Sequence, residues 1–275
     1  MSAFVRLQKL LPQHLLSRVA GRLASSEVSW IRGPLVRAFA RVYGVDMQEA
    51  ERPDLASYRS FNDFFTRSLT PDARPVDPAT NSVVSPADGV VSQTGSIERG
   101  ELLQAKGIRY SFSALADACA GPEFEGGAFA TVYLSPKDYH RVHLPLAGRL
   151  TRTVAIPGKL FSVNATTEAG VEGLFAVNER LVCEFETEFG KMLVVMVGAL
   201  VVASIETVWS SPRSPYREKR VDTYDLAFAK GAEIGRFLLG SSVVIAFEHD
   251  RVRLDAGLAS GSVVRMGESI GTGVV

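Results

Sequence analysis

The C-terminal two thirds of this chain consist of short, valine-rich runs separated by glycine and proline, and this pattern constrains the fold more than any other feature. Valine, isoleucine and aromatic residues are typical of β-strands, whereas glycine and proline are typical of the turns between them. The stretch FETEFGKMLVV also predicts a hairpin that turns near Gly190. Clear runs are GVVSQTGSI (89–97), FATVYLS (129–135), VCEFETEFGKMLVVMVGA (182–199) and SSVVIAFEHDRVRL (241–254). We therefore expect a mostly antiparallel β domain.

The first 70 residues differ from the rest because their apolar residues follow helical spacing. SYRSFNDFFTRSL (57–69) places Phe61, Phe64 and Phe65 in one aromatic patch. The next segment, TPDARPVDPATNSVVSP (70–86), holds four prolines and predicts an ordered connection. The predicted fold class is therefore α+β, with a helical N-terminal region at residues 1–70 and a β-rich domain at residues 71–275.

Basic residues are concentrated near the N-terminus. Residues 1–41 carry seven lysines and arginines but a single acidic residue, Glu27. In QHLLSRVAGRLA (13–24) the apolar face consists of Leu15, Leu16, Val19 and Leu23, and the basic side chains point away from it. A basic amphipathic helix of this kind can lie in the interface of an anionic membrane. The alternative is a helix that packs on its own domain with its basic residues in solvent, and the segment alone leaves both open.

Charge, hydropathy and cysteine content exclude several other classes of protein. The formal net charge is zero, which argues against a surface built to bind nucleic acid. No apolar run reaches the roughly 18 to 20 residues of a membrane-spanning helix, and the N-terminus lacks the pattern of a secretory signal. Cys119 and Cys183 have neither zinc-binding nor CxxC spacing, so we expect two plain thiols in a reducing compartment.

Two further motifs hold polar residues that could carry chemistry. SPADG (85–89) places Asp88 in a turn that enters a strand, where aspartate is common for structural reasons. LSPKDYHRVHLPLAG (134–148) contains His140 and His143, which are three residues apart. Positions three apart on a regular strand point to opposite faces, and no other cluster supplies further ligands, so we expect no metal site. Taken singly, each of these residues has an adequate structural explanation.

Together with KGAEIGRFLLGSS (230–242), these motifs form a chemical set. A serine becomes a nucleophile when a base takes its proton and a third group orients that base. Asp88, one of the histidines and Ser241 could fill these roles. No GxSxG motif surrounds Ser241; instead Gly240 immediately precedes it. Because glycine lacks Cβ, the serine hydroxyl can approach the Gly240 carbonyl closely, which favours attack on the chain's own peptide bond.

The sequence resembles the bacterial phosphatidylserine decarboxylases, which are pyruvoyl-dependent enzymes made as self-cleaving precursors. The resemblance covers roughly residues 55–250. At position 242 this chain has serine where the family usually has threonine, so the side-chain hydroxyl is retained. The matching motifs are FNDFFTRSL (61–69), SPADG (85–89), DYHRVHLPLAG (138–148), FSVN (161–164), LFAVNER (174–180) and KGAEIGRFLLGSS (230–242).

The resemblance implies a role for each candidate residue. Asp88 would orient His143, which would act as the base on Ser241. The hydroxyl would attack the Gly240 carbonyl, and cleavage would give a β chain of residues 1–240 and an α chain of residues 241–275 that begins with a pyruvoyl group. Phosphatidylserine would form a Schiff base with this group and lose CO2 to give phosphatidylethanolamine. His140 would assist decarboxylation or reprotonation.

The resemblance also implies where the protein works. A lipid substrate accounts for the basic N-terminal helices, so we expect a peripheral protein on the cytoplasmic side of the cell membrane, with a homodimer of αβ units and no nucleic-acid partner. Two other classes remain as alternatives. A serine hydrolase with the triad Asp88, His143 and Ser241 would keep an intact chain, and a non-enzymatic membrane-associated β module would use residues 240–242 as a turn.

Overall fold

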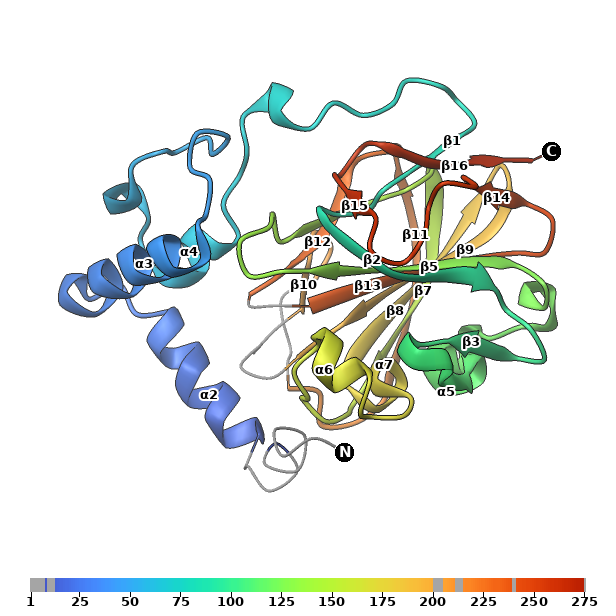
Figure 1. Ribbon diagram of the computed structural model, residues 1–275, viewed down its shortest axis with the longest axis horizontal. Coiled ribbons are helices and arrows are strands. Elements are labelled where there is room, and N and C mark those ends of the chain that lie inside the picture. The colour runs from blue at the N-terminus through green and yellow to red at the C-terminus, as the bar shows by residue number, and fades with distance from the viewer. Residues whose placement is uncertain (1–7, 9–12, 200–204, 211–214, 239–240, 275) are drawn as a thin grey trace.

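The computed structural model describes residues 8, 13–199, 205–210, 215–238 and 241–274. Within these residues, a group of helices stands beside a larger body of β-strands (Figure 1). The first three helices, α2, α3 and α4, come from the first 65 residues, and every described strand follows residue 81. The pairings between the named strands are antiparallel. The predicted α+β class with a mostly antiparallel sheet is therefore confirmed.

The described elements follow one another along the chain in this order. The α-helices are α2 (Gln13–Ala24), α3 (Ser29–Tyr43), α4 (Phe61–Phe65), α5 (Phe112–Ala116), α6 (Ala165–Glu168) and α7 (Leu174–Val177). The strands are β1 (Ser82–Val84), β2 (Gly89–Ser96), β3 (Glu101–Leu103), β4 (Arg109–Ser111), β5 (Ala128–Leu134), β6 (Arg141–His143), β7 (Gly148–Ile156), β8 (Arg180–Thr187), β9 (Gly190–Val197), β10 (Ile205–Thr207), β11 (Arg220–Phe228), β12 (Glu233–Phe237), β13 (Ser241–Phe247), β14 (Val252–Leu254), β15 (Val263–Val264) and β16 (Ser269–Gly273).

The centre of the β body is an eight-stranded sheet with the order β11-β7-β8-β9-β13-β5-β2-β15. Its middle strand, β13, is buried along its whole length. Because alternate side chains of a strand point to opposite faces, β13 contributes to both core clusters. Val243, Ile245 and Phe247 enter one cluster, and Val244 and Ala246 enter the other. Burying such large apolar side chains contributes about 1.5 to 3 kcal/mol each, so the core on both faces holds this strand rigidly.

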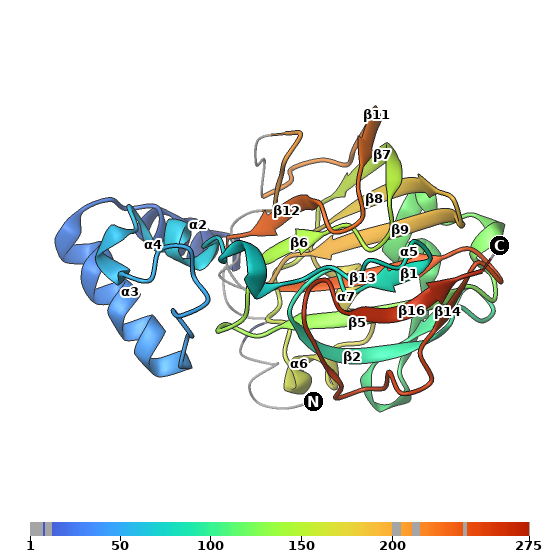
Figure 2. The ribbon, with the colours of Figure 1, turned by 90° about the horizontal axis from the view of Figure 1, so that it is seen from above.

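Two smaller three-stranded sheets flank the large one, with the orders β10-β12-β6 and β1-β16-β14. Figure 2 shows β6 and β12 on the side of the β body that faces the helices. Since β12 ends at Phe237 and β13 begins at Ser241, the chain passes here from the small sheet into the centre of the large one. Ser241 therefore lies where the chain enters the centre of the large sheet.

The predicted hairpin is also confirmed. Strands β8 and β9 pair antiparallel from Arg180–Val197 to Thr187–Gly190, so the turn consists of the two residues before Gly190. Gly190 has φ +83°, a left-handed conformation that glycine adopts without the strain that a Cβ would impose. Local turn chemistry was sufficient to place this element.

The helical region is held together by aromatic side chains. Helix α4 begins where the Ser60 hydroxyl caps it by accepting a hydrogen bond from the Asp63 amide, 3.1 Å away. Its three phenylalanines are buried, as the aromatic patch predicted, and the Phe39 ring of α3 meets the Phe61 ring with centroids 4.9 Å apart. This aromatic cluster joins α3 to α4.

The buried face of helix α2 is not the apolar face predicted from the sequence. Ser17 and Ala24 are buried, whereas Leu16, Val19 and Leu23 are 39%, 49% and 49% exposed. Further exposed apolar side chains lie on α3, where Trp30 is 76% exposed. These three side chains of the predicted apolar face are therefore exposed to solvent. Among the described residues, no helix has both the length and the hydropathy needed to cross a membrane.

Candidate active site

The candidate nucleophile, Ser241, is the first residue of the central strand β13. It pairs with Leu134 of β5, and the next residue, Ser242, pairs with Tyr133 and with Val197 of β9. Both serines are buried, and neither hydroxyl has a hydrogen-bond partner among the described residues. Gly240, the other predicted residue of the cleavage site, lies outside the described residues. Leaving a buried hydroxyl unpaired costs about 1 to 3 kcal/mol, so two adjacent unpaired hydroxyls indicate a site that is not purely structural.

Asp88 lies at the same end of the sheet. It directly precedes β2, and β2 and β13 lie on opposite sides of β5, so the backbones of these two strands are about 10 Å apart. The close approach of β2 to β5 requires glycine at position 89, because a Cβ there would lie 2.2 Å from the Tyr133 carbonyl oxygen. The strand register therefore brings the predicted aspartate and serine to one region.

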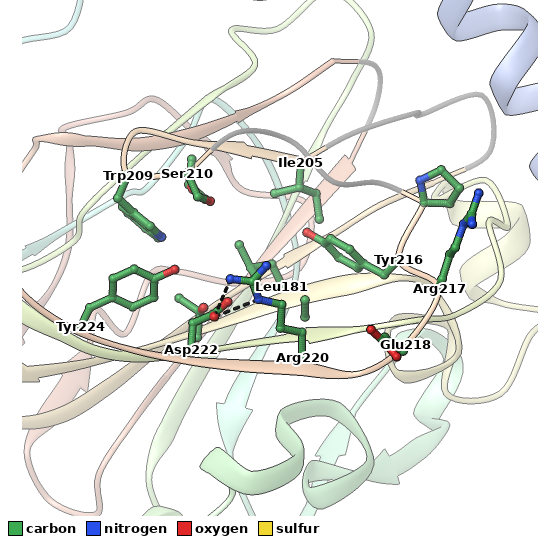
Figure 3. A pocket seen from close by; sticks show the side chains of 14 residues that line it. Leu181, Ile205, Trp209, Ser210, Tyr216, Arg217, Glu218, Arg220, Asp222 and Tyr224 are labelled. Carbon is green, nitrogen blue, oxygen red and sulfur yellow. Dashed lines mark hydrogen bonds and ion pairs between the residues drawn. The ribbon is translucent and has the colours of Figure 1, made fainter.

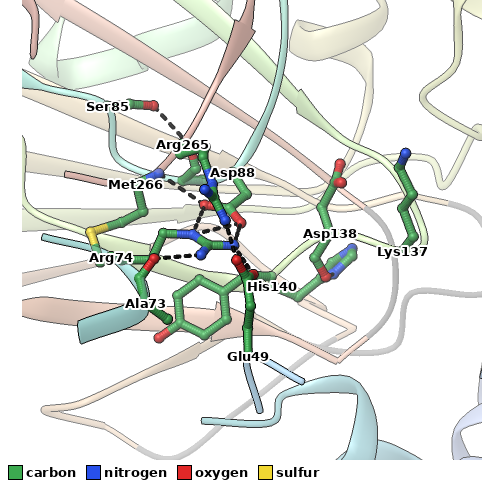
Figure 4. A network of polar contacts seen from close by, with 12 residues as sticks. Glu49, Ala73, Arg74, Ser85, Asp88, Lys137, Asp138, His140, Arg265 and Met266 are labelled. Atoms are coloured by element: carbon green, nitrogen blue, oxygen red, sulfur yellow. Dashed lines mark hydrogen bonds and ion pairs between the residues drawn. The ribbon is translucent and has the colours of Figure 1, made fainter. Parts of the chain in front are cut away.

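The Asp88 carboxylate is held by an arginine that sequence reasoning missed. The Arg74 Nε donates to its Oδ1 at 2.8 Å, and the Met266 amide donates to the same oxygen at 2.9 Å. Arg74 also pairs with Glu49 at 2.8 Å, and Glu49 in turn pairs with Arg265. Figure 4 shows this network of two arginines and two carboxylates around Asp88. Asp88 is therefore fixed by Arg74, and it makes no hydrogen bond to either histidine.

His143 is positioned by groups other than Asp88. Its Nδ1 donates to the Gly231 carbonyl at 2.8 Å, so in the neutral ring Nε2 carries the lone pair and accepts from the Tyr139 hydroxyl at 3.1 Å. Gly231 has φ +76°, and a Cβ there would lie 2.6 Å from Val76, so this carbonyl position requires glycine. Burial lowers the pKa of His143, while its hydrogen bond to Gly231 and the charges of Glu233 and Asp88 oppose that effect. Asp88 thus acts on His143 through its charge.

The backbone brings His143 close to the Asp88 turn. The His143 amide donates to the Pro86 carbonyl at 2.8 Å, two residues before Asp88. The segments SPADG and DYHRVHLPLAG therefore run side by side, although they are more than 50 positions apart in the sequence.

His140 is completely buried and lies against the helical region. Its ring centroid is 4.0 Å from that of Phe65 in α4. Its Nδ1 donates to the Asp138 carbonyl at 2.9 Å, and its Nε2 has no partner among the described residues. Burial lowers the pKa of His140 to about 3, so the ring is neutral at pH 7 and Nε2 is a free base.

His140 is also tied to the strand that leads to the serine. The Phe237 amide donates to the His140 carbonyl at 3.0 Å. Phe237 is four residues before Ser241, so the Cα atoms of Phe237 and Ser241 are at most about 14 Å apart. His140 thus contacts the last residue of β12, whereas His143 pairs with Glu233 at the start of that strand.

Comparisons with known proteins identify the family of this chain. A family model described as phosphatidylserine decarboxylase matches residues 61–272, and a second, described as PSD, matches residues 3–44. The chain belongs to the phosphatidylserine decarboxylase family. It is 53% identical to the phosphatidylserine decarboxylase proenzyme of Azotobacter vinelandii over 98% of this chain and 97% of that protein. The proenzymes of Pseudomonas fluorescens and Acinetobacter baylyi are 52% and 50% identical, over 97% and 94% of their lengths.

Membership of the phosphatidylserine decarboxylase family confirms the resemblance seen in the motifs. The structure gathers the four candidate residues at one end of the central sheet, but it adds Arg74 and Tyr139 as their direct partners. Tyr139 directly precedes His140 in a motif already singled out, so it could have been found. Arg74 lies in the proline-rich connection, where nothing in the local pattern distinguishes it from an ordinary charged loop residue.

A separate cavity of about 280 Å³ opens between β11 and the segment around β10. Figure 3 shows Trp209, Tyr216 and Tyr224 around it, with Arg220 and Asp222 paired on its floor at 2.6 Å. None of the four candidate residues lines this cavity. This cavity is therefore distinct from the candidate active site.

Proposed function

We propose that this chain is the precursor of a phosphatidylserine decarboxylase, which converts phosphatidylserine to phosphatidylethanolamine and CO2. Its family and its relatives of about 50% identity, named phosphatidylserine decarboxylase proenzymes, support this function. The single structural observation that carries the proposal is the buried, unpartnered hydroxyl of Ser241 at the start of β13. A buried serine hydroxyl without a hydrogen-bond partner does not stabilise the fold, but its position suits a residue that is converted into the reactive group.

The precursor would cut itself between Gly240 and Ser241. The Ser241 Oγ attacks the Gly240 carbonyl carbon, the peptide C–N bond breaks, and an ester to the serine oxygen forms. A base then removes the Cα proton of Ser241, and the Gly240 carboxylate leaves. The resulting dehydroalanine takes up water and loses ammonia, which leaves a pyruvoyl group at the start of a 241–275 chain. The unpartnered hydroxyl meets the requirement of this chemistry, since no hydrogen bond has to be broken before attack.

We assign the base to His143. Its bond to the Gly231 carbonyl holds the tautomer with a lone pair on Nε2, which is the form a base requires. Tyr139 occupies that lone pair in the present arrangement, so His143 must exchange the Tyr139 hydroxyl for the Ser241 hydroxyl. The Asp88 charge would stabilise the imidazolium that forms. Arg74 would hold the Asp88 carboxylate in position for this purpose.

His140 would serve the decarboxylation itself. The pyruvoyl group supplies the carbonyl that binds the substrate amine and takes up the electron pair released with CO2. Because the His140 ring is neutral at pH 7, its unpartnered Nε2 can accept a hydrogen bond from the substrate ammonium and orient the amine. The negative charge of the substrate carboxylate beside the ring would raise the pKa of His140, which would let the same nitrogen take the ammonium proton and return a proton at Cα after CO2 has left.

We further propose that the protein binds the cytoplasmic face of the cell membrane through its helical region. The exposed stripe of Leu16, Val19 and Leu23 would enter the acyl boundary. The neighbouring arginines of α2 and α3 would meet anionic headgroups, and the exposed ones include Arg22, Arg37 and Arg41. The processed αβ units would form homodimers.

A denaturing gel combined with mass spectrometry tests the proposed function. Purified active protein should consist of two chains, residues 1–240 and 241–275, and the shorter should be blocked to Edman degradation. A Ser241→Ala variant should remain at full length and release no CO2 from phosphatidylserine. An intact chain that still turns over phosphatidylserine would refute self-cleavage, and ester hydrolysis by an intact chain would favour a serine hydrolase.

A further inference from the structure

Arg67, two residues after the end of α4, is a buried cation that forms no ion pair with any carboxylate of the described residues. It is 4% exposed. Its Nη2 donates to the Lys137 carbonyl at 3.0 Å and lies 3.5 Å from the Asp138 carbonyl oxygen. Its Nε and Nη1 have no hydrogen-bond partner among the described residues, and it forms none of the ion pairs found there. Burying a charge in this way is costly unless a partner is supplied.

Another arginine of this protein shows how a purely structural guanidinium is accommodated. Arg180 is equally buried, at 4% exposed, but its Nε donates to the Leu115 carbonyl at 2.8 Å. Its Nη1 donates to the carbonyls of Ala176 and Asn178, and its Nη2 donates to that of Ala114. All three nitrogens of Arg180 are therefore satisfied. The two unfilled nitrogens of Arg67 set it apart from this arrangement.

The carboxylates nearest to Arg67 in the structure are committed elsewhere. Asp88 is held by Arg74, and Asp138 accepts a hydrogen bond from the Ser135 amide at 2.7 Å. Asp63 pairs with Arg52 at 2.7 Å. The charges of Asp88 and Asp138 act on Arg67 without a direct ion pair, and an anionic ligand would supply the direct partner that no described carboxylate provides.

The position of Arg67 connects it to the candidate active site. Its Nη2 and the His140 Nδ1 both approach the Asp138 carbonyl oxygen. The Phe64 ring lies 5.8 Å from the guanidinium carbon, while the adjacent Phe65 covers His140. Arg67 thus lies where the helical region meets the His140 loop. A lipid held by the helices would present its headgroup at this junction.

We propose that Arg67 binds the phosphodiester of the phosphatidylserine headgroup. This inference rests on the proposed function. The substrate carries two anions, but they differ in what happens to them during the reaction. The carboxylate loses its charge as CO2 forms, so a guanidinium bound to it would stabilise the ground state more than the transition state. The phosphodiester keeps its charge throughout, so binding it holds the substrate without opposing the reaction. Its two free oxygens can accept from the two unfilled nitrogens.

Steady-state kinetics of full-length, self-cleaved variants test this assignment. Arg67→Met should cleave normally, and its KM for phosphatidylserine in mixed micelles should rise at least about tenfold with kcat changed less than about threefold. The inhibition constant of phosphatidylethanolamine, which has the phosphodiester but no carboxylate, should rise by the same factor. Arg67→Lys, which keeps the charge, should show a smaller rise in both. Arg59→Met, an exposed arginine eight positions earlier, serves as the control and should match the wild type.

Each other outcome overturns the assignment. A raised KM with unchanged inhibition by phosphatidylethanolamine would place Arg67 on the carboxylate, and a fall in kcat alone would give it a role in chemistry. If Arg67→Met does not fold, the Arg67→Lys constants decide in the same way. If neither variant cleaves, Arg67 serves processing instead. Failure of the proposed function itself would be distinct, because the wild type would then be uncut or inactive.

Discussion

Removal of Arg74 should destabilise this protein far more than removal of an exposed arginine. The Arg74 and Asp88 side chains are 9% and 10% exposed. Without Arg74, the Asp88 carboxylate would keep only the Met266 amide as a partner. Breaking a buried ion pair by deleting one partner costs about 3 to 5 kcal/mol. We therefore expect Arg74→Met to lower the free energy of unfolding by about 3 kcal/mol, which corresponds to a fall in Tm of roughly 6 °C or more for a chain of this size.

The measurement requires a chain of uniform covalent structure. Both variants should be made in the Ser241→Ala background, so that only uncut precursor is compared, and unfolding followed by calorimetry and urea titration. The matched control is Arg149→Met, whose partner is Asp225 and whose ion pair has side chains 51% and 81% exposed. Surface pairs of this kind contribute about 0 to 1 kcal/mol. If Arg74→Met costs no more than Arg149→Met, the inference that Arg74 holds Asp88 as a buried charge is wrong.

Three further predictions concern the histidines and the helical region. His143→Ala should leave the precursor uncut on a denaturing gel, whereas His140→Ala should cleave and decarboxylate about 100-fold or more slowly; cleavage by His143→Ala would exclude it as the base. Because burial lowers the pKa of His140 from 6.5 to about 3, the unfolded chain binds a proton below pH 6.5 that the folded chain does not. Between pH 7 and pH 5 this residue should therefore lower the free energy of unfolding by about 2 kcal/mol. In His140→Gln, urea titrations at the two pH values should show that this part of the pH dependence of stability is lost. If the pH dependence of the variant equals that of the wild type, the inference of a buried neutral ring is wrong. The exposed stripe of α2 consists of Leu16, Val19 and Leu23, and replacing all three by serine should weaken cosedimentation with anionic vesicles by about tenfold or more. The control Val221→Ser, on the exposed edge strand β11, should cosediment as the wild type does. Equal losses in the two variants would argue against a specific membrane face.

The elements that could be predicted are those whose cause is local. The hairpin of β8 and β9 follows from turn chemistry at Gly190, and the buried face of α4 follows from the spacing of its phenylalanines. The order of the eight-stranded sheet does not follow from any local pattern. It places β13 between β5 and β9, which come from distant parts of the sequence, and such pairings depend on how all the apolar faces are buried together.

The candidate site divides in the same way. Asp88, His140, His143 and Ser241 could be named as candidates from the sequence because each lies in a distinctive motif. Their contacts were not found: Asp88 was expected to orient His143, yet it pairs with Arg74, and His143 is oriented by the Gly231 carbonyl. The expected role of Asp88 toward His143 therefore remains a proposal that rests on charge. Arg67 belongs to a motif that was noted, but its missing counter-charge is visible only once its surroundings are known.

The sequence by itself determined the residue types available for chemistry, the helical and β-rich regions, and the family to which the chain belongs, because these depend on side-chain identity and short-range spacing. The tertiary structure alone decided which carboxylate each arginine meets, which histidine is neutral and unpartnered, and which helix face is left exposed. These properties depend on burial and on contacts between residues far apart in the chain, since both the cost of a charge and the pKa of a side chain are set by what surrounds it.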